Sequence, residues 1–493
     1  MTTDMDSFDP FVDPMTKELE RFDPFVVAEI ERQQTDRGNR ASFDIENPFD
    51  ALVKSVKMDL GSLPFLSSEC SIYRVPEGLR HIKEKAYTPQ LVSIGPLHYG
   101  REGLKAMEEH KMRYLKALIE RIGESLEFFV GLVKEKEARL RGFYAETIPF
   151  SREEFVKIIL VDAAFLVEVL LRSHEEKQRS ENNSDAPPRS YSTPQKGEND
   201  QDVSTCSYLT EPQDENDPIF NKSRMIQDVW PDMMMLENQV PFFILEDLYN
   251  ILPCPSRRLS ITELSFSFFT MTGCLTRAQV KRISSASSAK GEHFVDLLRH
   301  IHVPSKAMNK RTVRTSTTPS MTNLNQAGVQ FQVGSSNNLL DIKFAKGILE
   351  MPKLTIGPGI ELPIRNIVAF EHCHRLDPYM NDFVIIMDRL VNTSKDVDLL
   401  AEHGILVNLE ADSNEAAYII NKLAAGSCMR NNFYFASLSN KLEAYCSKSW
   451  HKWQANLKQN YFNTPWAIIS FVAAFFLLSL TLIQTVSSVI SIS

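Results

Sequence analysis

The amino-acid sequence predicts a mainly α-helical fold, with a multi-helix globular body, a small β-meander near residues 329–356 and one transmembrane helix close to the C-terminus. Three observations lead to this fold class. Apolar residues recur every three to four positions through much of the chain after residue 104, which is the spacing of amphipathic helices. They alternate with polar residues around 329–333, which is the spacing of strands. Residues 466–483 contain no charged side chain, which is typical of a helix that crosses a bilayer.

The first 65 residues are expected to form an acidic, disordered tail. They hold 14 acidic and 7 basic residues, a composition that does not favour a packed core. Within them the sequence SFDPFV occurs at 7–12, RFDPFV at 21–26 and NPFD at 47–50. Aromatic residues beside Asp-Pro or Asn-Pro make compact turns that can present a Phe ring to a shallow pocket.

These short motifs resemble peptides that endocytic adaptor domains bind, so the tail is a candidate partner-binding segment. Its candidate contact residues are Phe8, Phe11, Phe22, Phe25 and Phe49. The alternative is that the motifs only form turns. The chain opens with early acids and no apolar run, so we expect no secretory signal peptide.

The globular body is expected over residues 66–460, interrupted by disordered linkers at 173–218 and 304–323. Both linkers are rich in polar residues and lack a hydrophobic period. Amphipathic patterns predict helices in the first half of the body at 104–122 and 126–140.

A central helix is predicted over residues 155–172, opened by a capping box that starts at residue 151. Ser151 and Glu154 have the spacing of a capping box, which marks the start of a helix. The helix is apolar on almost every face, so we expect it in the middle of the body. Before Arg172 at its end, its charged residues are Lys157, Asp162 and Glu168.

The second half of the body alternates helical patterns with the predicted strands. Two helical segments are expected over 224–249, joined around Glu237, Asn238 and Gln239. A long helix is expected from about residue 433 towards the anchor. The other predicted helices cover 260–269, 293–302, 363–373, 379–391, 396–402 and 413–424.

The C-terminal apolar run predicts a transmembrane helix over 465–486. At 1.5 Å per residue this run covers roughly 30 Å, the hydrocarbon thickness of a bilayer. Pro465 suits a first helical turn, and Trp466 stands where an interfacial aromatic belt belongs. The alternative is a buried core helix, which would normally show a polar stripe that this run lacks. Representative membrane-spanning residues are Trp466, Phe471, Phe475, Leu480 and Ile483.

The charges beside the anchor predict its orientation. Lys448, Lys452 and Lys458 precede the apolar run and no charge follows it, so the positive-inside rule places the body in the cytosol. We therefore expect a single-pass, post-translationally inserted anchor in the plasma membrane or an endomembrane. The seven cysteines are odd in number and never spaced C-x-x-C, which suits a reducing compartment.

The net charge of −9 argues against a nucleic-acid partner. Acidic residues concentrate in the tail and in 175–218, where 11 acids face 4 bases. The remainder of the chain has no dense basic face of the kind that nucleic-acid binders need. The partners expected from the sequence are the lipid bilayer and unidentified proteins.

Seven blocks of residues, in order, resemble the plant family known as domain of unknown function 247. They include SIYRVPEGLR from residue 71, DMMMLENQVPFFILEDLY from residue 232 and YFNTPWAIISFVAAFFLL from residue 461. The resemblance covers roughly residues 68–488. It implies a plant protein with a C-terminal membrane anchor and no established catalytic activity. Some grass members of the family are implicated in self-incompatibility.

The polar junction Glu237-Asn238-Gln239 has two interpretations. It would form a polar pocket for a ligand or partner, or it would satisfy unpaired backbone groups where two helices meet before Pro241. We favour the second, because it also explains the position of the proline.

Two further groups of residues invite a functional interpretation. His372 and His374, in the sequence Glu371-His372-Cys373-His374, do not share a helix face, so we interpret this group as a helix end rather than a metal site. Asp162 is expected either to be paired or to have a raised pKa. The residues considered as its partner are Arg74, Arg80, His98 and Arg101.

The sequence predicts a non-enzymatic protein without a cofactor. It contains no G-x-S-x-G, phosphate-loop, H-E-x-x-H or kinase pattern. The predicted function is protein–protein recognition or signalling at a membrane, with self-incompatibility as one instance. The alternatives are an enzyme whose site is assembled from distant residues, and a membrane scaffold without specific recognition.

Overall fold

A computed structural model of the chain divides it into two compact units, residues 1–65 and 66–493. The residues that the structure describes are 48–62, 67–184, 217–221, 225–253, 259–277, 279–280, 291–304, 317–374, 376–410, 412–447 and 465–490. Within these residues the fold is mainly helical, which confirms the predicted fold class.

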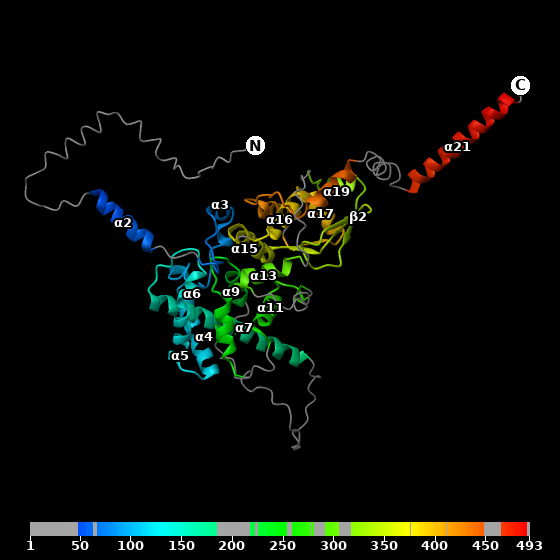
Figure 1. Ribbon diagram of the computed structural model, residues 1–493. Helices are drawn as coiled ribbons and strands as arrows, with labels where there is room; N and C mark the ends of the chain where they lie inside the picture. Colours follow the sequence, from blue (N-terminus) through cyan, green and yellow to red (C-terminus); the bar gives the residue numbers. More distant parts are fainter. Residues whose placement is uncertain are drawn as a thin grey trace, which may run out of the picture. The chain divides into compact units, whose positions relative to one another are not determined.

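In the first unit, helix α2 (Pro48–Ser62) corrects the expectation that the whole tail lacks regular structure (Figure 1). Proline suits the first helical position, and apolar residues recur at 49, 52, 53, 56 and 60 on one face. Phe49 lies in the first turn with 66% of its surface exposed. The other four candidate contact residues of the tail, Phe8, Phe11, Phe22 and Phe25, lie outside the described residues.

In the second unit, the long helix α7 (Arg152–Ser184) organises the first group of helices (Figure 1). It packs against α4 (Ala106–Ile122), α5 (Leu126–Glu135) and α6 (Glu137–Gly142). The expected central position of this helix is confirmed, because Phe155 to Leu171 are buried apart from Lys157. The single run expected over 126–140 is split into α5 and α6 near Lys136.

Helix α7 continues twelve residues beyond the predicted end at Arg172, so the start of the expected linker at 173–218 is helical. Residues 175–179 are Glu, Glu, Lys, Gln and Arg, which are good helix formers. Arg121 on α4 also binds Glu168 at 3.1 Å and Glu175 at 2.7 Å, which fixes this extension to the body.

Short helices complete the first group, and several of them pack on α7. Ser260 and Glu263 form a reciprocal capping box at the start of α11. The elements of this group are α3 (Glu77–Arg80), η3 (Glu84–Ala86), η4 (Glu102–Leu104), α8 (Pro218–Asn221), α9 (Met225–Met233), α10 (Phe242–Asn250), α11 (Ile261–Met271) and α13 (Phe294–His302). Helix α14 (Met321–Gln326) follows in the chain and packs on the second group of helices, described below. Helix α14 begins inside the expected linker at 304–323, capped by Ser320.

The predicted strands exist, but their pairing is not a meander. Strand β3 (Ile348–Met351) lies between β1 (Gln330–Val333), which is parallel to it, and β2 (Lys343–Ala345), which is antiparallel. Strand β4 (Leu354–Ile356) leaves this sheet and pairs in parallel with β5 (Leu406–Asn408).

The connections explain this topology. Lys346 and Gly347 both have positive φ, which makes the tight turn of the β2–β3 hairpin. The nine residues 334–342 are long enough to carry the chain from β1 past β3 to the opposite edge, where β2 begins. Parallel pairs join segments distant in sequence, which an alternating pattern alone does not reveal.

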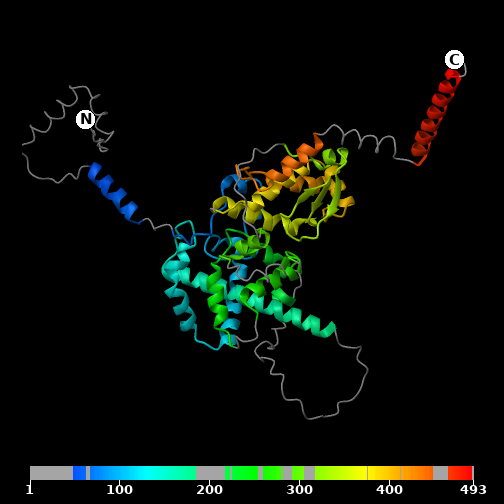
Figure 2. The ribbon, with the colours of Figure 1, turned by 45° about the vertical axis from the view of Figure 1, so that its right-hand side comes forward.

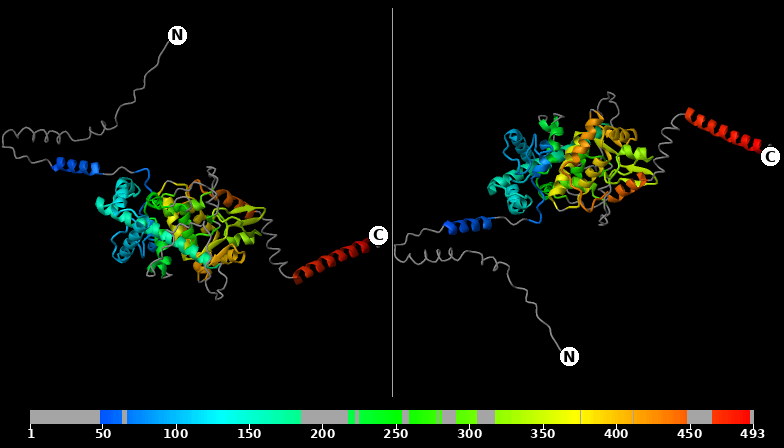
Figure 3. Two further views of the ribbon diagram at one scale, coloured as in Figure 1. Left: turned by 90° about the horizontal axis from the view of Figure 1, so that it is seen from below. Right: turned by 90° about the horizontal axis from the view of Figure 1, so that it is seen from above.

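The second group of helices packs around the strands (Figure 2). It contains α15 (Pro358–Cys373), α16 (Tyr379–Leu390), α17 (Ser394–Glu402), α18 (Ser413–Ala424) and α19 (Ala436–Cys446). Both views in Figure 3 show the cyan helices at one end of this body and the yellow-to-orange elements towards the other. Helix α15 contacts α9 and α13 of the first group, and one continuous apolar core runs from Ile72 to Leu442.

Helix α21 (Pro465–Ile490) contains the predicted apolar run. Its segment Ile469–Ser487 is long and apolar enough to cross a membrane, and none of it is buried against the protein. Trp466, Phe471, Phe475, Leu480 and Ile483 are all exposed. The alternative of a buried core helix is therefore wrong. The long helix expected from residue 433 is described only as α19, because residues 448–464 lie outside the described residues.

Candidate functional site

The polar junction joins the end of α9 to the start of α10, and its three side chains are completely buried. The Glu237 carboxylate accepts a hydrogen bond from the backbone N–H of Val75 (2.6 Å) and forms an ion pair with Arg80. A terminal nitrogen of Arg74 lies 3.4 Å from it, and Nε2 of His98 lies 3.1 Å from it. Burial alone would raise the pKa of Glu237, but hydrogen bonding from His98 and Val75 and the charge of Arg80 hold it below its usual value.

The two amides of the junction hold backbone groups from other parts of the chain. Asn238 accepts from the N–H of Ile94 (2.8 Å) and donates to the carbonyl of Val92 (2.9 Å). Gln239 accepts from the N–H of Phe294 at the start of α13 (3.0 Å). The junction thus forms hydrogen bonds with otherwise unpaired backbone groups, as the favoured interpretation predicts. These groups belong to the 92–94 loop and α13 as well as to the junction itself.

Asp162 in α7 is paired with Lys111 of α4, and both side chains are buried. Nζ of Lys111 lies 2.5 Å from the carboxylate and also donates to the carbonyl of Ser93 (2.8 Å). The second carboxylate oxygen accepts from the N–H of Gly95 (2.7 Å). Burial raises the pKa of Asp162 to about 6, although the charge of Lys111 and its hydrogen bond oppose this shift.

The suggested partners of Asp162 were wrong. Arg74, Arg80 and His98 contact Glu237 instead. The signal that was missed lies in the helix at 104–122, where Lys111 occupies a position between Met107 and Tyr114 on the apolar face. A lysine on the buried face of a helix requires an acidic partner.

Gly95 connects the Asp162 pair to the junction. It adopts φ +72°, and a side-chain Cβ there would lie 2.3 Å from the carbonyl oxygen of Gln239. That carbonyl accepts a hydrogen bond from the Tyr144 hydroxyl (3.1 Å). Because no side chain other than hydrogen fits, the loop can pass between α7 and the junction only with glycine here.

The junction and the Asp162–Lys111 pair together form one buried polar cluster, whose polar atoms bind other groups of the protein. Its carboxylates and amides bind backbone groups or buried cations, and neither of the two apolar spaces described below is lined by them. The cluster fixes the 92–95 loop against two helices. This arrangement is suited to maintaining the fold and offers no exposed acid–base pair for chemistry.

The segment Glu371-His372-Cys373-His374 ends α15 and holds other elements in place. The Glu371 carboxylate binds Arg299 (3.1 Å), and Nδ1 of His374 lies 2.8 Å from the Tyr73 hydroxyl. Burial raises the pKa of Cys373 to about 11, which disfavours the thiolate that binds metals. Among the described residues, no group of three or more His, Cys, Asp or Glu side chains is arranged to hold a metal ion.

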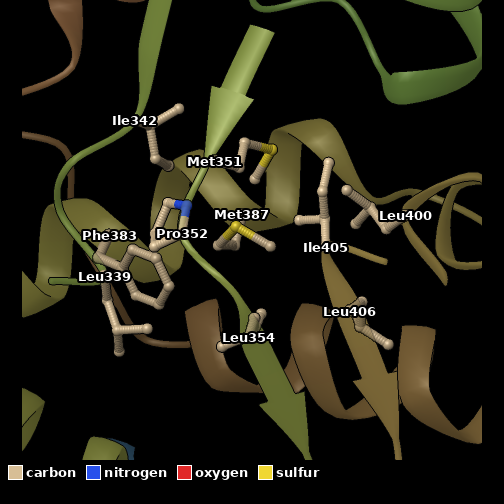
Figure 4. Close-up of a pocket in the computed structure, with 10 residues that line it drawn as sticks. All are labelled: Leu339, Ile342, Met351, Pro352, Leu354, Phe383, Met387, Leu400, Ile405 and Leu406. Atoms are coloured by element: carbon tan, nitrogen blue, oxygen red, sulfur yellow. The ribbon is translucent and has the colours of Figure 1, made fainter. Parts of the chain in front are cut away.

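A small enclosed space lies between the strands and α16 (Figure 4). Its volume is about 10 Å³, roughly the size that one water molecule needs, and its lining offers almost no polar group. It is a packing defect in an apolar core and too small for a ligand. The lining residues are Leu339, Ile342, Met351, Pro352, Leu354, Phe383, Met387, Leu400, Ile405 and Leu406.

A larger apolar groove opens to solvent between α4, α5 and α7, with a volume of about 330 Å³. We call it the α5 groove. The sequence patterns at 104–122 and 126–140 predict amphipathic helices but do not indicate this groove, because a groove depends on how three helices are spaced. The lining residues are Met112, Leu115, Leu126, Val130, Lys134, Arg152, Glu153, Val156, Lys157, Leu160 and Val161.

Residues 72–480 match the family DUF247, described as a plant protein of unknown function. The UPF0481 protein At3g47200 of Arabidopsis thaliana is 23% identical over 454 residues, covering 86% of this chain and 87% of its own. The putative UPF0481 protein At3g02645 of the same plant is 22% identical over 541 residues, covering 89% of this chain and 94% of its own. No solved structure matches the chain.

Proposed function

Starting from the fact that the chain belongs to the plant family DUF247, whose function is unknown, we propose that it is a membrane-anchored protein that acts by binding other proteins and not as an enzyme. The observation that carries the proposal is α21, which exposes the apolar segment Ile469–Ser487 along its whole length. In water this surface would aggregate, whereas in a bilayer it is stable.

The polar residues of α21 support its placement in lipid. The hydroxyls of Ser479, Thr481 and Thr485 donate to backbone carbonyls one turn earlier, at 2.8 Å in each case. These bonds remove the cost of burying an unpaired hydroxyl in hydrocarbon. The helix is therefore suited to a single crossing of a plasma membrane or endomembrane.

Two observations support a binding role for the body. The buried carboxylates are engaged with cations and backbone N–H groups, which leaves them unsuited to general acid–base chemistry. The α5 groove exposes apolar side chains that a soluble domain would normally cover. Anchoring confines this groove to a membrane surface and raises its effective concentration for partners there. Self-incompatibility recognition is one process in which such a binder would act.

The orientation proposed for the body is cytosolic, with the tail available to trafficking adaptors. The lysines at 448, 452 and 458 support this orientation, since cytoplasmic flanks of membrane helices are enriched in basic residues. In the tail, Phe8, Phe11, Phe22 and Phe25 stand beside Asp-Pro, and exposed Phe49 begins α2. Replacing all five with alanine would reduce recovery of endocytic adaptors, whereas a scaffold without specific recognition would keep its neighbours and distribution.

The test of the proposed function combines fractionation with proximity labelling of the full chain in plant cells. A biotin ligase fused before residue 66 would label cytosol-facing proteins, and the chain would remain in membranes washed with alkaline carbonate. Release by carbonate would contradict the anchor. Labelling of extracellular proteins alone would contradict the orientation. As a control, the ligase is fused to residues 465–490 without the body. If this control labels the same proteins as the full chain, specific binding by the body is contradicted.

A further inference from the structure

The α5 groove has a closed apolar floor and open apolar walls. Its floor is formed by Val156, Leu160 and Val161 of α7, which are buried. On the walls, Leu126 of α5 and Met112 of α4 keep 49% and 46% of their surfaces exposed. Val130, one turn after Leu126 on the same wall, is 37% exposed. Apolar side chains that line a concave surface gain more by contact with a partner than scattered ones do.

The dimensions of the groove suit a short helix. Leu126, Val130 and Lys134 line it at a spacing of four residues along α5. Eight residues of α-helix span about 12 Å, so the wall is as long as roughly two helical turns. A helix laid along it would place apolar residues at i, i+4 and i+7 against the floor and walls, as in other helix-in-groove complexes.

The charges of the groove select an acidic partner. Lys134 at the end of α5 and Arg152 at the start of α7 lie at one end, where a terminal nitrogen of Arg152 is 3.4 Å from the Lys134 carbonyl oxygen. Lys157 follows slightly more than one turn along α7, and Glu153 is the one acidic residue in the lining. Arg152 is already paired, because its Nε lies 3.7 Å from a carboxylate oxygen of Glu137. Among the described residues, neither Lys134 nor Lys157 has an ion-pair partner within 4.0 Å. The groove is therefore apolar along its length, and its positive charge, which lies towards one end, comes chiefly from Lys134 and Lys157.

We propose that the α5 groove binds an amphipathic helix of a partner protein, with the apolar face on α7 and acidic residues beside Lys134, Arg152 and Lys157. The inference rests on the proposed function, because it identifies the surface by which the anchored body recognises its partner. A basic helix is disfavoured by repulsion at the charged end, which gives the groove specificity as well as affinity.

The test uses the full chain in nanodiscs of phosphatidylcholine, which has no net charge. The probe is a fluorescein-labelled synthetic 16-residue helix with Leu at i, i+4, i+7 and i+11 and two Glu residues at one end. A second probe has Lys in place of both Glu residues. In fluorescence anisotropy at low salt we expect the acidic probe to bind at least tenfold more tightly than the basic one. High salt would reduce this difference, since exposed charges are screened.

Matched variants locate the binding. Lys157→Glu and Leu126→Asp are each expected to weaken binding of the acidic probe at least tenfold, and an acidic residue in the first turn of α5 is compatible with the helix. The controls are Lys395→Glu on α17 and Tyr418→Asp on α18, which are exposed and outside the groove. They are expected to leave binding unchanged, and thermal unfolding of all four variants checks that each remains folded.

Several outcomes would overturn the inference. These are equal binding of the two probes, equal loss in groove and control variants, and equal binding to nanodiscs without protein. A dimer that forms with rising protein concentration and disappears in Lys157→Glu would assign the groove to a second copy of the chain. Failure of the chain to enter nanodiscs would instead contradict the membrane anchor. The same titration would then be run on the chain without nanodiscs. The anchor and the binding of a helix in the α5 groove can therefore be contradicted independently.

Discussion

At the scale of single residues, the buried carboxylates differ in what stabilises their charge. Glu237 faces Arg80, His98 and a backbone N–H, and its pKa is lowered despite burial. Among the residues that the structure describes, Asp232 in α9 accepts from the backbone N–H groups of 90–92, and burial raises its pKa to about 6. Backbone N–H groups alone thus do not offset the desolvation of Asp232, whereas several cations together do so for Glu237. A single cation is not enough for Asp162, whose pKa is raised to about 6 although it is paired with Lys111.

Replacing Glu237 with alanine is expected to destabilise the protein by about 3–5 kcal/mol, because Arg80 and the Val75 N–H would lose their buried acceptor. The matched control is Glu146→Ala, which removes the other carboxylate bound to Arg74. Glu146 is 45% exposed, so its loss should cost at most about 1 kcal/mol. Chemical denaturation of both variants measures the difference, and equal costs would contradict the central role of Glu237.

Asp232→Asn tests the raised pKa of Asp232 through pH. The folded protein holds this proton more tightly than the unfolded chain between the ordinary pKa of 3.8 and about 6. The contribution of the protonated acid to stability is therefore complete below about pH 4 and is lost as the pH rises to about 6. Asparagine does not titrate, so the advantage of the wild type should shrink by about 2–3 kcal/mol over this interval. Denaturation curves at pH 4 and 6.5 measure the difference in unfolding free energy between the wild type and the variant. A difference that stays constant or grows with pH would contradict the raised pKa of Asp232.

At the scale of elements, the loop at 92–95 depends on the backbone freedom of one glycine. Gly95→Ala is expected to cost at least about 2 kcal/mol, because positive φ is strained for alanine and its Cβ would overlap the Gln239 carbonyl. Gly100→Ala provides the control, since Gly100 also has positive φ but no atom within 4 Å of the added Cβ. Its cost should be about 1–2 kcal/mol. Comparable unfolding midpoints for the two variants would mean that the overlap is relieved by movement of the loop.

Helices can be predicted from the sequence where a hydrophobic period repeats locally. Most contacts between segments distant in sequence cannot be predicted in this way. The patterns at 104–122 and 413–424 correspond to α4 and α18, because one apolar face is enough to mark a helix. The parallel β1–β3 pair depends on where the connection at 334–342 leads, and the α5 groove depends on how three helices are spaced. The Glu237 junction was located by its polar residues between apolar runs, but its cations come from the 70–101 segment, which only the fold brings close.

At the scale of the whole molecule, the anchor and the body place different demands on the sequence. The core from Ile72 to Leu442 consists of buried apolar side chains. Helix α21 instead leaves the predominantly apolar segment Ile469–Ser487 exposed. The length and composition of this segment are those of a helix that crosses a bilayer. We therefore expect charge in α21 to affect membrane insertion while leaving the body intact.

The double variant Phe475→Arg and Leu478→Arg places two charges near the middle of Ile469–Ser487. Each arginine at a helix centre disfavours insertion by about 2.5–3.5 kcal/mol, so the variant should move from the carbonate-resistant pellet to the supernatant. Phe475→Leu and Leu478→Ile serve as the control, since they keep the apolar character and should remain in the pellet. Retention of the arginine variant in the pellet would mean that another part of the chain holds it to the membrane.

The orientation of the body can be read from glycosylation of the full chain. The sequence Asn392-Thr393-Ser394 is an acceptor site, and Asn392 is exposed at the end of α16. With a cytosolic body this site is never modified, whereas a glycosylated sequence appended after residue 493 would enter the lumen and acquire glycan. We therefore expect one endoglycosidase-sensitive mass shift in the chain with the appended site and none in the chain without it. The opposite pattern, with modification of Asn392 and none of the appended site, would reverse the orientation and place the α5 groove where cytosolic partners cannot reach it.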